Sequence, residues 1–107
     1  MAALDLRSTQ TFPHTATTTV TNTALREIQL PVQAGKVTVS SKAGEVYLFA
    51  DDGLSDGDSV PGSGYFPIPS SNALSLNIGR GSTRRSSIFV AFATHASGLV
   101  HVVVEEI

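Results

Sequence analysis

Alternation of apolar and polar residues is the main pattern along this chain. Val37 and Val39 flank Thr38, and residues 15–21 are β-branched almost throughout. A period of two places successive side chains on opposite faces of a strand, so such segments are typical of half-buried strands. The pattern predicts strands of this kind at residues 15–21, 28–32, 36–40, 74–78 and 99–107, with Val32 among the inward-facing side chains.

Two segments break the alternation because they are apolar at consecutive positions. They are residues 46–50 (VYLFA) and residues 88–93 (IFVAFA). A strand that is apolar on both faces needs cover on both faces. The two segments are therefore predicted to be central strands covered on both sides by their own chain, or strands with one face covered by another subunit.

Helical periodicity is nearly absent from the chain. The one stretch with helix-like residues, 23–30, meets Pro31, and its second half is predicted to be a strand. Glycine, proline and aspartate clusters separate the other segments, as turns require. About seven to eight short strands with no crossover helix predict an all-β fold, an antiparallel β-sandwich or jelly roll. We expect residues 1–14 to form an extended N-terminal arm and residues 15–107 to form the sandwich domain.

Composition narrows the functional classes. The 107 residues suit a single domain with one core. The formal net charge of −2 gives no drive towards nucleic acid, and no apolar run approaches the length that spans a bilayer. There is no cysteine for a disulfide or a thiolate metal site. We therefore expect a soluble protein with no nucleic-acid or membrane partner.

The acidic segment DDGLSDGD, residues 51–58, suggests either a calcium loop or a turn. An EF-hand register beginning at Asp52 places Leu54 where an oxygen ligand belongs and Ser63 where the final glutamate belongs, so that motif fails. A calcium site of another kind remains an alternative. Its candidate ligands are Asp51, Asp52, Asp56 and Asp58. Because Asp-Gly pairs are also common in turns, we interpret the segment as a surface turn and expect no metal or other cofactor.

Other candidate chemistry is sparse. Arg80, Arg84 and Arg85 form a basic cluster that is a possible partner contact or a solvated loop tip. His95 and His101 would face one another if a hairpin joined them, but zinc requires a third ligand. No serine lies in a nucleophile elbow. We expect that the protein is not an enzyme.

The large aromatic residues have two interpretations. A sugar-binding sandwich would expose two or three of them as a platform, whereas a structural protein would bury them in cores and interfaces. Six of them lie in or beside predicted strands: Tyr47, Phe49, Tyr65, Phe66, Phe89 and Phe92. This placement favours packing.

Several stretches together resemble small structural proteins of tailed bacteriophages, in particular head-decoration or cement proteins. They are EVYLFADDG (45–53), GYFPIPS (64–70), LSLNI (74–78) and IFVAFATHASGLVHVVVEE (88–106). The resemblance implies a β-sandwich on the capsid surface of the virion, a homotrimer, and binding to the major capsid protein. It also implies shell contact through the N-terminal arm, whose apolar anchors are Leu4, Leu6 and Phe12.

Two other functions remain open from the sequence. One is a carbohydrate-binding or host-contacting sandwich of a virion fibre or tail. The other is a structural component of the tail or neck with the same fold.

Overall fold

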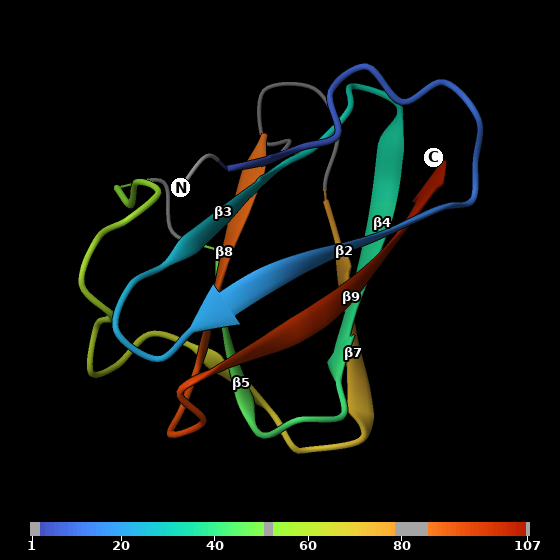
Figure 1. Cartoon of the computed structure of the whole chain (residues 1–107). Coiled ribbons are helices and arrows are strands. Elements are labelled where there is room, and N and C mark those ends of the chain that lie inside the picture. The colour runs from blue at the N-terminus through green and yellow to red at the C-terminus, as the bar shows by residue number, and fades with distance from the viewer. Residues whose placement is uncertain (1–2, 51–52, 79–85, 107) are drawn as a thin grey trace.

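The computed structural model describes residues 3–50, 53–78 and 86–106. They form nine strands in two sheets that pack face to face, which confirms the all-β sandwich (Figure 1). The first sheet has the order β1 (Leu4–Asp5), β3 (Arg26–Gln29), β8 (Ser87–Phe92), β5 (Val46–Phe49) and β6 (Phe66–Ile68). The second has the order β2 (His14–Thr21), β9 (Ser97–Glu106), β4 (Ala34–Ser41) and β7 (Asn72–Asn77). Within the described ranges, no helix is long and apolar enough to cross a membrane.

The strands predicted from alternation form with the expected inward faces, with one exception. The inward valines of β4 and β9 are buried, and Leu74 and Leu76 of β7 pack against the same core. Val32, in contrast, is 70% exposed, so the prediction that it faces inward is wrong. The strand ends at Gln29, and the Ala34 N–H donates to the Pro31 carbonyl at 3.1 Å, which turns the chain before Val32 can join the core.

Two short edge strands raise the strand number above the prediction. β1 pairs with β3 in parallel, Leu4 opposite Ile28, whereas the other strand pairs are antiparallel. β6 contains Pro67, which is tolerated because β6 has a partner, β5, on one side only. Neither segment has a run long enough for an alternating pattern to be visible.

The main core lies between the two sheets. Both sheets contribute alternate side chains to it, as is usual where two sheets pack face to face. Its fully buried members include Ile28, Val37, Val39, Val46, Leu48, Ile88, Val90, Phe92, Val100, Val102 and Val104.

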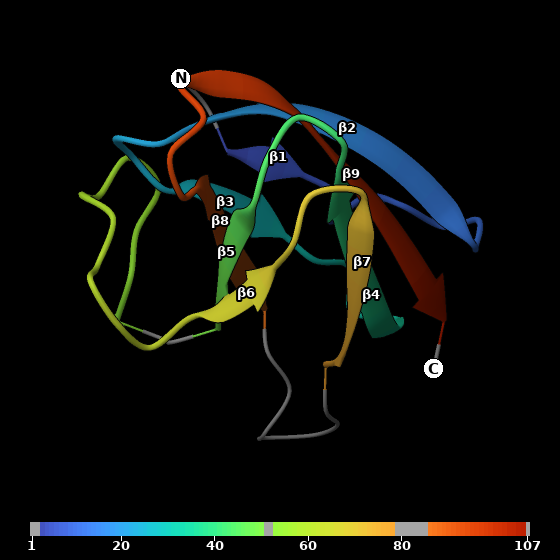
Figure 2. The same ribbon diagram turned by 90° about the horizontal axis from the view of Figure 1, so that it is seen from below.

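A second, smaller core lies on the outer side of the five-stranded sheet. Phe49, Phe89 and Ala91 project there and pack with Leu25. The segment between β5 and β6 runs over this side (Figure 2) and brings Leu54, Val60 and Tyr65 against them. These three side chains are partly buried. The Tyr65 ring stacks on Tyr47 at a centroid distance of 3.8 Å and meets Phe49 edge-on at 5.8 Å.

This second core answers the question raised by the two apolar segments. Both faces of β5 and β8 are covered by the chain itself, so the alternative in which another subunit covers one face is wrong. The homotrimer implied by the resemblance therefore gains no support from these two strands. The cover was hard to foresee because Leu54, Val60 and Tyr65 stand singly among glycine, serine and aspartate.

Candidate binding face

The predicted shell-binding arm lies on its own sandwich. Leu6 is buried in the main core, and Leu4 and Phe12 are partly buried against it. The Leu6 N–H donates to the Gln29 carbonyl at 2.9 Å, which continues the β1 contact with β3. In this structure the three apolar side chains are thus core residues, and they do not form exposed anchors.

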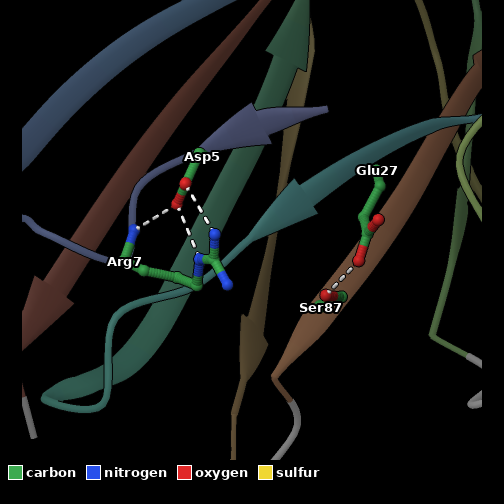
Figure 3. Close-up of polar contacts among 4 residues, drawn as sticks. All are labelled: Asp5, Arg7, Glu27 and Ser87. Atoms are coloured by element: carbon green, nitrogen blue, oxygen red, sulfur yellow. Dashed lines mark hydrogen bonds and ion pairs between the residues drawn. The ribbon is translucent and has the colours of Figure 1, made fainter. Parts of the chain in front are cut away.

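Charged side chains beside the arm are paired. Arg7 donates from Nε and Nη2 to the two carboxylate oxygens of Asp5, both at 2.9 Å (Figure 3). This bidentate contact lowers the pKa of Asp5 to about 2. Nearby, the Ser87 hydroxyl donates to the Glu27 carboxylate at 2.6 Å (Figure 3). A hollow of about 340 Å³ between Arg7, Glu27 and Ser87 is thus bordered by polar groups that already have partners.

The acidic segment is a structural turn where the structure describes it. The Asp58 N–H donates to the Ser55 carbonyl at 3.1 Å, and Gly57 has φ of 86°, which suits the third position of a type II turn. The Asp58 carboxylate accepts from the Ser55 N–H at 2.9 Å. Asp51 and Asp52 lie outside the described residues. Among the residues that are described, no cluster of three or more histidine or acidic side chains could hold a metal ion.

Asp56 fastens this turn to β3. Its Oδ1 accepts from the Glu27 N–H at 2.9 Å and lies 3.6 Å from Nη1 of Arg26, whose side chain is 8% exposed. Backbone bonds join the same elements, because the Leu25 N–H donates to the Asp58 carbonyl and the Gly57 N–H donates to the Leu25 carbonyl. The acidic residues therefore anchor the segment that covers the second core.

The remaining predicted sites do not converge. Arg80, Arg84 and Arg85 lie outside the described residues. His95 packs edge-on against Phe92 at 5.1 Å, whereas His101 lies within β9 opposite Thr17. Since β8 and β9 belong to different sheets, no hairpin ladder places the two histidines across from each other. The hairpin that could have brought the two histidines together is therefore not formed.

The aromatic residues pack mainly with one another. Phe49, Phe89 and Phe92 are core residues, and Tyr47 and Tyr65 stack together. Of the phenylalanines that the structure describes, Phe66 is the most exposed, at 46%. A platform of two or three open aromatic rings is not present among the described residues.

The outer side of the four-stranded sheet has a different character. We call it the open face. It consists of the outward side chains Thr15, Thr17 and Thr19 of β2, Leu99, His101, Val103 and Glu105 of β9, Lys36, Thr38 and Ser40 of β4, and Ala73, Ser75 and Asn77 of β7. Its only formal charges are Lys36 and Glu105, which pair at 3.8 Å at one end. Leu99 is 53% exposed.

The strand register arranges these side chains in rows across the open face. One row runs Thr15, Val103, Thr38, Ser75, and the next runs Thr17, His101, Ser40, Ala73. Thr38 and Ser75 share a hydroxyl hydrogen bond of 2.8 Å. Two hollows flank His101, one of about 540 Å³ towards β7 and one of about 340 Å³ towards β2. The face is therefore broad, with His101 at its centre. Its outward strand residues carry little charge, although Lys42, just beyond β4, also lines the larger hollow.

Comparisons with known proteins do not assign a function to the open face. No family model, no curated protein and no solved structure matches this chain.

The open face was missed in the sequence, although its signal is present there. The polar residues that alternate with the apolar ones in these strands are mostly threonine and serine. Strands that face water usually carry lysine and glutamate as well. The sequence shows that charge is scarce in the alternating strands, but only the strand order places those positions on one surface.

Proposed function

We propose that this protein is a non-enzymatic structural protein of a bacteriophage virion, a capsid decoration protein. It binds the major capsid protein on the outside of the head through the open face. The observation that carries the proposal is the near absence of charge from the outward side chains of four adjacent strands.

Depletion of charged residues distinguishes the centres of protein interfaces from other surfaces. On the open face, Leu99 and Val103 supply apolar contact, and the hydroxyls of Thr17, Thr38 and Ser40 supply hydrogen bonds. A single contact of this kind need not be strong. Decoration proteins act in many copies on a lattice, and engagement of more than one site converts modest affinity into lasting attachment.

The strand order supports the same proposal. From β2 to β9 the connections cross between the sheets except at β5–β6, giving the sheet orders β2-β9-β4-β7 and β3-β8-β5-β6. We infer that this arrangement is a jelly roll, an architecture found in viral capsid and lectin domains. It agrees with the resemblance to phage head proteins noted from the sequence.

The test is binding to empty, expanded heads of the phage that encodes the protein, measured by co-sedimentation and by electron microscopy. Leu99→Lys should reduce binding at least about tenfold, because it places an unpaired charge in the desolvated contact. Ser59→Lys, an equal change of charge in the exposed segment between β5 and β6, should bind like the wild type. Wild-type protein that leaves the heads bare would refute the proposal, and glycan binding without head binding would favour the host-contacting alternative.

A further inference from the structure

The exposed edge of β2 has features that native sheets usually avoid. β2 pairs with β9 over all eight of its residues with no register shift, and it is the outermost strand of its sheet. Its sequence, HTATTTVT, contains no lysine, proline or acidic residue. Such devices normally protect an edge from pairing with another strand. Two of the other edges are less suited to pairing, since β1 has two residues and β6 has three, one of which is Pro67. The remaining edge, β7, also lacks lysine, proline and acidic residues, but it has six residues where β2 has eight.

Two side-chain contacts identify which backbone groups of β2 point outward. Nε of Arg26 donates to the Thr19 carbonyl at 3.3 Å. On the paired strand, the Leu99 carbonyl accepts from the Ser41 hydroxyl of β4 at 3.4 Å. Thr19 and Leu99 are opposite each other, yet their carbonyls serve partners on opposite sides, so they form a non-hydrogen-bonded pair.

The alternation of an antiparallel ladder extends this assignment along the strand. Thr15 and Thr17 also occupy non-hydrogen-bonded pairs with β9, so their N–H and C=O groups point away from it. No described residue makes a hydrogen bond to those groups. At Thr19 the carbonyl already has Arg26 as a donor. Pro13, immediately before β2, has no N–H to offer.

These groups are complementary to themselves about a twofold axis at Ala16. In that antiparallel register, Thr15 lies opposite Thr17 of the second copy, and each such pair exchanges both backbone hydrogen bonds. Pro13 lies opposite Thr19 of the second copy. Pro13 has no N–H to donate to the Thr19 carbonyl, but that carbonyl already accepts from Arg26. In the other direction, the Thr19 N–H can donate to the Pro13 carbonyl.

We propose that β2 is a self-association edge, and that two copies of this chain pair their β2 strands antiparallel about Ala16. The dimer has a continuous eight-stranded sheet, and the threonine side chains at 15 and 17 pair across the junction on the open face. No charge opposes the contact, because β2 carries no acidic or basic side chain apart from His14 at its start. The proposal holds whether or not the open face binds a capsid.

The test combines solution mass with charge changes that report the register. Sedimentation analysis over a wide concentration range should show a monomer–dimer equilibrium, with amides of Thr15 and Thr17 protected from hydrogen exchange as the concentration rises. T15K/T17K places lysine opposite lysine and should weaken the dimer at least about tenfold. T15E/T17K places glutamate opposite lysine in this register and should restore it. These side chains are exposed on the open face, so each variant should keep the wild-type circular dichroism and thermal midpoint.

A73K/S75K is the matched control, because it adds the same charges to the exposed edge strand β7. It should dimerise like the wild type. The proposal is overturned by a wild-type protein that is monomeric at every concentration, or by equal loss of the dimer in A73K/S75K. It is also overturned if T15E/T17K associates no better than T15K/T17K, because the register about Ala16 is then wrong.

Discussion

Phe89→Ala tests whether the second core belongs to the monomer. Phe89 is 4% exposed and faces the segment between β5 and β6. Burying a phenylalanine removes about 150–250 Å² from water, worth about 4–6 kcal/mol at about 25 cal/mol per Å². Alanine keeps only part of that gain and leaves a cavity, so the free energy of unfolding should fall by about 3–5 kcal/mol.

The assay is urea unfolding followed by circular dichroism at two widely separated protein concentrations. If the chain itself covers Phe89, the loss of stability is the same at both concentrations. The total free energy of unfolding of a small domain is about 5–15 kcal/mol, so the alanine variant could be unfolded in water. In that case Phe89→Leu replaces it in the assay, because this substitution should lower the free energy of unfolding by no more than about 1.5 kcal/mol. Phe66→Ala removes the same atoms from an exposed edge position and should cost less than about 1 kcal/mol. A cost at Phe89 no larger than at Phe66, or one that vanishes on dilution, would show that the second core is misassigned.

Two further predictions concern the turn and the arm. Gly57→Ala should lower the free energy of unfolding by about 1–2 kcal/mol, because a φ of 86° is strained for a residue with a side chain. The control is Gly62→Ala, at a position with open space and no positive φ, which should leave stability unchanged or raise it by up to about 1 kcal/mol. Equal effects of the two substitutions in thermal melts would contradict the turn. An NMR titration should give Asp5 a pKa of about 2, returning towards its ordinary 3.8 in Arg7→Ala. Because the pKa of Asp5 is lower in the folded protein than in the unfolded chain, the contact stabilises the fold at pH values above 3.8, and this stabilisation is lost as the pH falls towards 2. If Arg7→Ala leaves the pKa of Asp5 unchanged, the contact with Arg7 is not the cause of the low pKa.

The sequence predicted the strands in which periodicity and propensity agree. β4 and β9 alternate over many residues, and their valines are buried as expected. Val32 was predicted wrongly because alternation was extended through Pro31, although the proline begins a turn. β1 and β6 are set by long-range pairing with β3 and β5, which no local pattern reports.

The candidate sites were harder to predict for a physical reason. Leu4, Leu6 and Phe12 were predicted to be the anchors of a capsid-binding arm, whereas in this structure they pack against their own sandwich. The acidic segment was correctly interpreted as a turn at Ser55–Asp58, while its attachment to Arg26 depends on a contact between residues distant in sequence. A neutral face assembled from four strands is a property of the strand order, so single segments do not reveal it.

The position of β9 governs when the protein can fold. β9 is the last of the nine strands to be synthesised, yet it lies between β2 and β4 and joins them into one sheet. Until it has emerged from the ribosome, β2 has no ladder partner and β4 has β7 alone as a neighbour in its sheet. Nascent chains therefore expose unpaired strand edges, and such species are prone to misassembly.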